Sequence, residues 1–279
     1  MPFLNKMQDI HRLFLQCLIS TPFMSEAETK ASYSRCVQLF NEGEVEGNFD
    51  LEGFENCIRS INSGVRSLFL EVRKGVSEDD GTYYYGLVNN SEDQIARLAT
   101  NYSPHDIDFF RKVLDTLVQS EDGTAESVHL LHAAADLPKS ISVSNAENLL
   151  DMWVKDKWLS KSSGSYWLGP RAYLELQPYL KRIYHDYIVD CSICMNIVLR
   201  GQNCVACDVK IHHHCAAKYF YQRILKKCPG CQIEWPHDID PSLARMEVAV
   251  NNGSYRQNAR SRTSEFGSSG SVGKKKPRR

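Results

Sequence analysis

The chain has 279 residues, of which 42% are hydrophobic and 24% charged. This composition is typical of globular proteins and excludes a wholly disordered, collagenous or membrane-embedded chain. No apolar run approaches the roughly 18 residues that a membrane helix needs. Polar residues between Gln8 and Arg12 interrupt the apolar stretch that a secretory signal requires. We therefore expect no membrane partner.

The net charge of −1 conceals an uneven distribution. Residues 252–279 hold eight Lys or Arg and one acidic residue, so this part carries +7 and the rest of the chain −8. An acidic body does not attract the phosphates of DNA, and we expect little direct DNA binding. Low apolar content predicts a disordered basic tail at 241–279. Its basic run at 274–279 is compatible with nuclear import or weak nucleic-acid contact.

Apolar residues recur at helical spacing through the first sixty residues and predict three helices. Ser25 with Glu28 forms a capping box that opens the second helix, and Asp50 can cap the third. The three apolar faces comprise Ile10, Leu13, Phe14, Cys17 and Leu18; then Tyr33, Cys36, Val37 and Phe40; then Phe54, Cys57, Ile58 and Ile61. Because each single cysteine lies on one of these faces, we expect unreactive core residues rather than reactive thiols.

The pattern next predicts a β-hairpin, in which strands 68–72 and 83–88 flank a turn that contains Asp80-Gly81. A helix with Ile95 and Leu98 inward follows. The same order of three helices, a hairpin and a helix then recurs. Ser103-Pro104 opens the first helix, the second contains Val128 and Leu131, and a capping box of Ser144 and Glu147 opens the third. A hairpin of strands 158–161 and 166–168 follows, and a closing helix begins at Pro170. Two such copies predict tandem winged-helix domains at 1–100 and 101–186, and an α+β fold.

Winged helices often bind DNA through their third helix. Here acidic residues outnumber basic ones in both third helices. The first has Asp50, Glu52 and Glu55 against Arg59 and Arg66. The second has Glu147, Asp151 and Asp156 against Lys155 and Lys157. This charge favours a protein-docking surface over a DNA-binding one. The alternative is that these faces are simply solvated.

Seven of the ten cysteines lie between positions 191 and 231. Without a secretory signal, clustered cysteines indicate metal ligands in a reducing compartment rather than disulfides. Four ligand pairs have metal-binding spacing: Cys191 and Cys194, Cys204 and Cys207, His212 and Cys215, Cys228 and Cys231. These eight ligands predict two structural zinc ions, one held by three cysteines and a histidine and the other by four cysteines.

Two filled sites leave no open coordination position for a hydrolytic zinc, and no cysteine in this region remains as a nucleophile. We therefore assign no catalytic residue, and zinc would instead stabilise a segment too small to fold unaided. One alternative is a set of unmetallated surface cysteines. Another is a register in which His213 replaces His212; otherwise His213 and His214 fit surface or outer-shell positions.

The ligand order is shared by plant homeodomain fingers and RING-like domains, and residues 187–240 resemble the latter. A proline after the seventh ligand, here Pro229, is typical of RINGs, whereas Lys226 stands where plant homeodomains carry an aromatic residue. This resemblance implies that Ile193 and Pro229 contact a ubiquitin-conjugating enzyme. It also implies a cross-brace, in which the first zinc is held by Cys191, Cys194, His212 and Cys215 and the second by Cys204, Cys207, Cys228 and Cys231. The spacing alone leaves sequential pairing open.

As a whole, the chain resembles the RING-bearing non-SMC element subunits (non-SMC element one homologues) of the SMC five–six complex. The resemblance covers about residues 8–240 and is carried by GVSEDDG at 75–81, CAAKYF at 215–220 and WPH at 235–237. It implies a RING-type E3 ubiquitin ligase that acts in DNA double-strand break repair by homologous recombination. The implied partners are a MAGE-family subunit bound through the winged helices, a kleisin subunit, the SMC complex and a conjugating enzyme. The implied location is the nucleus, on chromosomes.

One residue departs from the RING pattern. Many active RINGs place Arg or Lys directly after the eighth ligand, where the charge holds ubiquitin against the conjugating enzyme, but this chain has Gln232. The alternative function is therefore a non-catalytic, zinc-stabilised docking subunit of the same complex. A histone reader is the third possibility.

Overall fold

The computed structural model describes residues 7–40, 49–90 and 102–245. Within these ranges no helix has the length and apolar character needed to cross a membrane. The predicted helix with Ile95 and Leu98 and the basic run at 274–279 lie outside the described residues. The described part ends in a short helix, α9 (Ser242–Arg245), inside the range predicted to be disordered. Asp240 accepts a hydrogen bond from the Ser242 backbone N–H at 2.8 Å and so initiates this turn.

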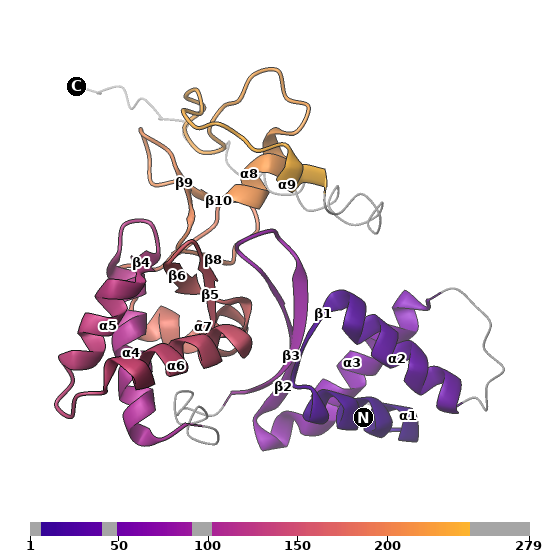
Figure 1. Cartoon of the computed structure of the whole chain (residues 1–279). Helices are drawn as coiled ribbons and strands as arrows, with labels where there is room; N and C mark the ends of the chain where they lie inside the picture. Colours follow the sequence, from indigo (N-terminus) through magenta and orange to yellow (C-terminus); the bar gives the residue numbers. More distant parts are fainter. Residues whose placement is uncertain (1–6, 41–48, 91–101, 246–279) are drawn as a thin grey trace, which may run out of the picture. The chain divides into compact units, whose positions relative to one another are not determined.

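The first domain combines three helices with a three-stranded antiparallel sheet in the order β1-β3-β2 (Figure 1). Its elements are α1 (Asp9–Ser20), β1 (Phe23–Ser25), α2 (Glu26–Phe40), α3 (Leu51–Val65), the 3-10 turn η1 (Arg66–Leu68), β2 (Leu70–Val76) and β3 (Tyr83–Asn89). The core lies between the helices and the sheet and is centred on Phe14, Phe54 and Ile61, all fully buried. Three helices followed by a hairpin, with an extra strand after α1, is the winged-helix order.

The helix starts in this domain agree with the cap residues of the sequence. The capping box of Ser25 and Glu28 is confirmed by reciprocal hydrogen bonds of 2.8 and 3.3 Å. Asp50 accepts from the Gly53 backbone N–H at 3.0 Å. Two details were wrong: the side chain of Phe40 is half exposed, and β2 begins at Leu70 rather than at 68. The strand starts late because η1 extends α3 and Phe69 then adopts a left-handed φ of 58°.

The second domain repeats this order, with a sheet ordered β4-β6-β5. Its elements are α4 (Pro104–Gln119), β4 (Thr124–Glu126), α5 (Ser127–Ala135), α6 (Val143–Lys155), β5 (Leu159–Ser162), β6 (Ser165–Leu168) and α7 (Pro170–Ile183). The predicted Ser103 cap is confirmed, since its side chain accepts from the Asp106 backbone N–H at 3.2 Å. The sequence did not predict the short strands β1 and β4, which complete the two sheets and have only three residues each.

One prediction for the second domain was wrong. Helix α6 begins at Val143, and its N-cap is Ser142, which accepts from the Asn145 backbone N–H, rather than Ser144. The buried Ile141 directly before the cap anchors the chain there and sets the earlier start. The predicted helix with Val128 and Leu131 is α5, whose inward face is centred on the fully buried Leu130.

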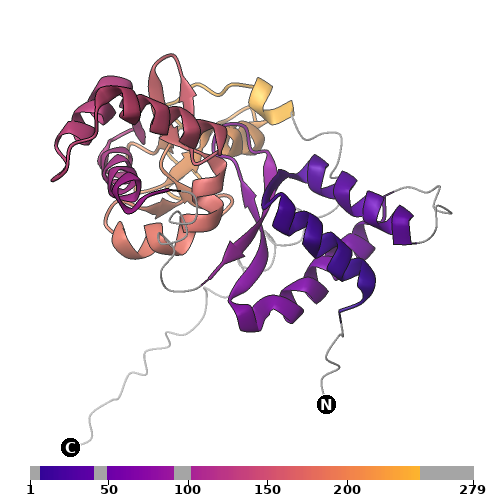
Figure 2. The same cartoon turned by 60° about the horizontal axis from the view of Figure 1, so that its bottom comes forward.

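Helix α7 of the second domain packs against strands β2 and β3 of the first (Figure 2). Leu174 fills the space above Gly75 and Gly86: a Cβ atom at either glycine would lie 2.6 or 2.3 Å from a Leu174 methyl carbon. Arg73 on β2 adds a hydrogen bond to the Leu174 carbonyl at 3.1 Å. The outer face of the first sheet is therefore covered by the second domain.

The third, smaller domain follows α7 and has little regular structure. Its elements are β7 (Val189–Asp190), β8 (Ile197–Val198), β9 (Gly201–Asn203), β10 (Lys210–His212) and α8 (His213–Phe220). Strands β7 and β8 pair with each other, as do β9 and β10. Ile197 and Leu199 are buried in the core of the second domain, whereas Phe220 and Trp235 help to form a separate small core. The smaller domain is thus anchored on the second.

Candidate metal centres

Eight side chains of the smaller domain form two compact clusters. The first contains Cys191, Cys194, His212 and Cys215, and the second contains Cys204, Cys207, Cys228 and Cys231. Within each cluster all ligand atoms lie within 4.8 Å of one another. The grouping alternates along the chain, as in a RING cross-brace. It places His212, rather than His213, in the first cluster.

Tight turns bring each pair of cysteines to one side of the backbone. Met195 and Gln232, each directly after a Cys-x2-Cys pair, adopt left-handed φ angles of 61° and 63°. Their backbone N–H groups donate to the carbonyls of Cys191 and Cys228, at 2.9 and 3.1 Å. The two turns have the same geometry, which orients both thiols of a pair toward a single point.

The spacing of the ligand atoms fits tetrahedral zinc. In the second cluster, Sγ of Cys204 lies 3.6 Å from that of Cys231, and Sγ of Cys207 lies 3.6 Å from that of Cys228. A tetrahedron with Zn–S bonds of about 2.3 Å has an edge of roughly 3.8 Å. In the first cluster, Nδ1 of His212 lies 3.4 Å from Sγ of Cys194 and 3.7 Å from that of Cys215. These distances match an ion-sized cage rather than disulfides.

Each cluster combines thiols whose pKa is lowered with thiols whose pKa is raised, and zinc binds the thiolate form. Hydrogen bonds from the Cys194 and Cys215 thiols lower the pKa of Cys191. In the second cluster, a hydrogen bond from the Ala206 backbone N–H lowers the pKa of Cys204 to about 6. Hydrogen bonding with Cys191 and Cys194 raises the pKa of Cys215. A hydrogen bond from the Val209 backbone N–H is outweighed by burial and the neighbouring thiols, which raise the pKa of Cys207 to about 12. Each cluster therefore contains both a thiol that ionises readily and a thiol that retains its proton.

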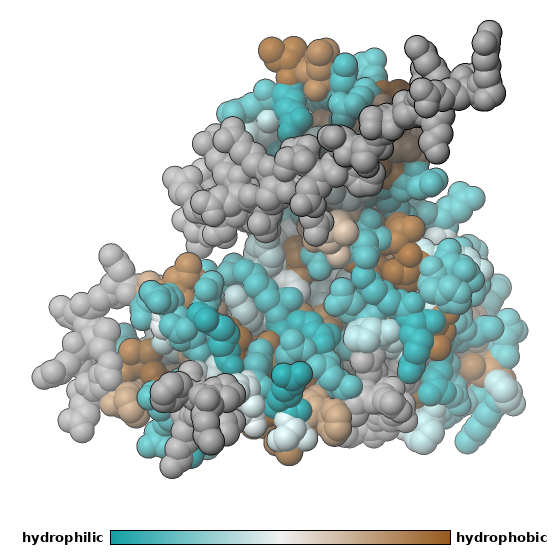
Figure 3. Space-filling view, turned by 180° about the vertical axis from the view of Figure 1, so that it is seen from behind, coloured by the Kyte–Doolittle hydropathy of each residue, from teal (hydrophilic) through white to brown (hydrophobic). Residues whose placement is uncertain are grey.

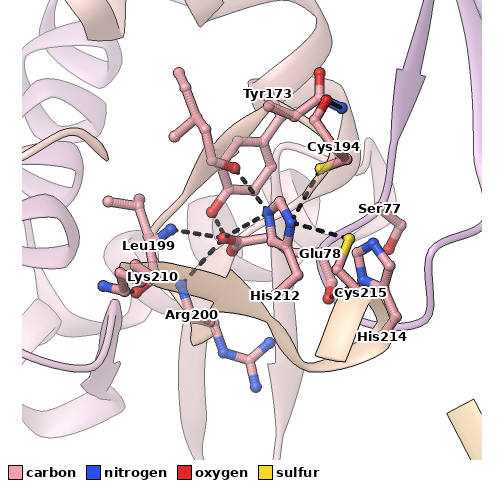
Figure 4. Close-up of polar contacts among 12 residues, drawn as sticks. Ser77, Glu78, Tyr173, Cys194, Leu199, Arg200, Lys210, His212, His214 and Cys215 are labelled. Carbon is pink, nitrogen blue, oxygen red and sulfur yellow. Dashed lines mark hydrogen bonds and ion pairs between the residues drawn. The ribbon is translucent and has the colours of Figure 1, made fainter. Parts of the chain in front are cut away.

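The other nitrogen of His212 is held by the protein. Its Nε2 lies 2.9 Å from the Ile197 carbonyl oxygen, to which an Nε2–H donates when Nδ1 faces the metal. The carboxylate of Glu78, on the loop between β2 and β3 of the first domain, lies 3.6 Å from the same nitrogen (Figure 4). Burial raises the pKa of Glu78, while the neighbouring His212 and several hydrogen bonds act in the opposite direction.

Sequence reasoning missed this carboxylate and its partner Tyr173. His214, expected at a surface or outer-shell position, is buried and stacks on His212. The motif around Glu78 contributed only to the family resemblance, and nothing in its spacing indicates proximity to ligands more than 100 residues away. The signal that could have been used is the short acidic turn itself, since three successive acidic residues in a hairpin loop can receive hydrogen bonds from a neighbouring domain.

The predicted conjugating-enzyme contacts lie at the clusters, but they are not the most exposed apolar residues. Ile193 and Pro229 are both half-buried. The exposed large apolar side chains of this domain are Val189, Met195, Val205, Tyr221, Ile224, Leu225 and Ile233, with Ile224 98% exposed. Brown apolar side chains are visible at the end of the molecule that the smaller domain occupies (Figure 3). Gln232 is exposed, and its amide lies 3.5 Å from the Pro229 carbonyl oxygen.

Comparison with known proteins gives a consistent result. Residues 11–137 match the family described as Nse1 non-SMC component of SMC5-6 complex, and residues 191–231 match the RING-like domain family. The chain is 34% identical to the human non-structural maintenance of chromosomes element 1 homolog, over 91% of this chain and 94% of that protein. It is 30% identical to the Xenopus laevis homolog, over 92% and 94%. A chain of a solved Nse1-Nse3-Nse4 complex superimposes with a TM-score of 0.73 at 32% identity, over 84% of this chain and 99% of that one.

Proposed function

The chain belongs to the family of Nse1 subunits of the SMC5-6 complex, and from this premise we propose that it is a RING-type E3 ubiquitin ligase subunit acting in DNA double-strand break repair by homologous recombination. It works in the nucleus, on chromosomes. The observation that carries this proposal is the pair of alternating four-ligand clusters, which fit two structural zinc ions. All eight ligands are protein side chains, so the metal contributes folding energy and does no chemistry.

Such a ligase would act by positioning. It holds the thioester of a charged conjugating enzyme beside an acceptor lysine, which raises the effective concentration of the reacting groups. The zinc-binding turns offer Ile193 and Pro229 to the conjugating enzyme. The exposed apolar side chains of Met195 and Ile233, which lie at the ends of these two turns, support this role, because exposed apolar groups mark interaction sites.

The proposed partners follow from the match to a chain of an Nse1-Nse3-Nse4 complex. We assign a MAGE-family subunit and a kleisin subunit to the positions of Nse3 and Nse4, with the winged helices as the docking surface and the remaining SMC complex beyond them. Exposed acidic residues on α3 and α6, such as Glu52, Glu55 and Glu147, favour protein over DNA at these helices.

Gln232 favours a second candidate function, a non-catalytic docking subunit. The position after the eighth ligand carries no charge here, and the exposed amide side chain reaches only the Pro229 carbonyl. A neutral donor there would hold ubiquitin less firmly than Arg or Lys.

The deciding experiment is ubiquitin discharge from a panel of charged conjugating enzymes, with the protein alone and with a MAGE-type partner. Ile193→Ala should reduce discharge while two zinc ions remain bound. Val205→Ala, an apolar residue in a turn of the other cluster, is the matched control and should leave discharge unchanged. If no combination discharges ubiquitin although two zinc ions are present, the docking function is the correct one.

A further inference from the structure

The loop between β2 and β3 of the first domain, residues 77–82, reaches the first ligand cluster. Glu78 is the second residue of this loop and is almost completely buried. Its Oε1 accepts hydrogen bonds from the backbone N–H groups of Leu199 and Arg200, at 2.6 and 3.1 Å. Its Oε2 accepts from the Tyr173 hydroxyl on α7. One carboxylate therefore joins all three domains (Figure 4).

The same loop also contacts the cluster through its backbone. His214 donates from Nδ1 to the Glu78 carbonyl oxygen at 3.2 Å, and its ring stacks on that of His212 with centroids 4.9 Å apart. Gly81 has a φ of +77°, and a Cβ atom there would lie 2.8 Å from the His214 ring. The loop is thus fitted closely against the two histidines.

The group that accepts a hydrogen bond from the second ring N–H of a metal-bound histidine fixes the orientation of that ring. A nearby carboxylate raises the basicity of the histidine. The Ile197 carbonyl accepts from Nε2 of His212, and the Glu78 carboxylate lies 3.6 Å from the same atom. Ile197 belongs to the strand immediately before Leu199 and Arg200, whose backbone Glu78 binds directly. Glu78 can therefore act on His212 both through its charge and through the position of that strand.

We propose that Glu78 is an outer-shell positioning residue of the Cys191–Cys194–His212–Cys215 zinc site, supplied by a domain that holds none of its ligands. Zinc retention at this site then depends on docking of the 77–82 loop. The inference rests on the zinc sites of the proposed function but not on ligase activity.

The second cluster offers an internal control. The thiols of this cluster accept hydrogen bonds from backbone N–H groups inside the zinc domain, those of Ala206, Val209, Gly230 and Ile233. Loss of Glu78 should consequently affect one zinc ion of the two.

The test uses the full chain with Glu78→Gln, which keeps the shape of the side chain and removes its charge. Zinc release to a colorimetric chelator should become roughly 10- to 100-fold faster for one ion, with the other unchanged, since loss of an outer-shell partner has that typical effect on affinity. The side-chain ¹H–¹⁵N correlation of His212 Nε2 should also shift. Asp80→Asn, which removes a charge from the same loop and whose carboxylate accepts hydrogen bonds from Thr82 within that loop, is the matched control.

The inference is wrong if each zinc ion leaves Glu78→Gln at the same rate as it leaves the unsubstituted protein. The same acceleration in Asp80→Asn would also overturn it, because the effect would then come from the charge of the loop in general and not from Glu78. If Glu78→Gln failed to fold, Tyr173→Phe would take its place, since it removes only the hydroxyl that holds the carboxylate. Fewer than two zinc ions in the unsubstituted protein would instead overturn the metal assignment itself.

Discussion

The indole Nε1 of Trp167 donates a hydrogen bond to the Oδ1 atom of Asp79 at 2.7 Å, although the two residues belong to different winged-helix domains. Trp167 lies on β6, in the hairpin of the second domain, and Asp79 lies in the hairpin loop of the first. The guanidinium of Arg200, from the zinc domain, lies 4.0 Å from the centroid of the Trp167 ring and pairs with Asp79. The two hairpins and the zinc domain therefore meet at one point.

Trp167→Phe should loosen this junction while the aromatic stack is kept. It removes a hydrogen bond to a charged acceptor, for which a loss of about 1.5–3 kcal/mol is typical. The Asp79 carboxylate retains its ion pair with Arg200 and is partly exposed, so we expect a loss of stability at the lower end of that range. Amide hydrogen exchange of residues 77–82 should become faster. Tyr221→Phe, at an exposed position of the zinc domain, should not change it, and equal exchange in both variants would contradict the role given to Trp167.

Cys215→Ala should unfold the zinc domain. The substitution removes one of four ligands from a cluster whose metal contributes about 10–16 kcal/mol to folding in comparable small domains. Zinc content, measured by atomic emission, should fall by at least one ion per chain, and circular dichroism should show lost structure. Cys17→Ala is the control, because Cys17 is a half-buried cysteine outside both clusters. Full zinc content in Cys215→Ala would refute the assigned ligand set.

Gln232→Arg should raise the rate of ubiquitin discharge several-fold. It restores the positive charge that many active RINGs carry after the eighth ligand, and a charged donor forms hydrogen bonds about twice as strong as a neutral one. The left-handed φ of 63° is no harder for Arg than for Gln, so the fold should be unaffected. Gln232→Ala controls for loss of the amide. A rate that does not change with Arg would show that this charge does not limit the reaction.

The thiols of Cys36 and Cys57 should resist alkylation in the folded protein. Burial is the main cause that raises the pKa of each to about 12, so at pH 8 only about one thiol in 10,000 is ionised. Labelling by iodoacetamide, followed by peptide mass spectrometry, should be at least about 1,000-fold slower than in urea. It should also rise roughly tenfold per pH unit, as the thiolate fraction does. Rapid labelling at pH 8 would contradict the burial of these residues.

Duplex DNA should bind the winged helices weakly. The exposed side chains of the third helices α3 and α6 include Glu52, Glu55, Glu147 and Asp151, which repel phosphate. At physiological salt we expect a dissociation constant no tighter than about 10⁻⁴–10⁻⁶ M, the range of non-specific binding. Replacing Glu52 and Glu55 by Lys should tighten binding and steepen its salt dependence. Tight binding by the unsubstituted chain that falls steeply with salt would reverse this assignment.

Local signals in the sequence predicted most of the fold. The caps at Ser25, Asp50 and Ser103 place helix starts correctly, because each satisfies backbone N–H groups within its own first turn. Signals failed where two equivalent residues compete: Ser142 and Ser144 can both cap α6, and the burial of Ile141 decides between them. The strands β1 and β4 were missed because three residues are too few to show alternation.

The ligand set of the metal centres was also predictable from local signals, because the two ligands of a pair, with two residues between them, share one turn. The position of Glu78 was not. Its partners Leu199 and Tyr173 are 121 and 95 residues away along the chain, and only the packing of three domains brings them together. A buried carboxylate with such distant partners has no periodicity that a sequence could reveal.

The two hairpins differ in length, and this difference determines how far each can reach. Strands β2 and β3 have seven residues each, whereas β5 and β6 have four. Three additional residues at about 3.3 Å each extend the first hairpin by roughly 10 Å. That distance is comparable to the diameter of a helix with its side chains. Shortening each strand by two residues, which keeps the facing of every side chain, would withdraw the loop from the zinc domain, so that the packing of α7 on β2 and β3 would remain as the contact of the first domain with the second.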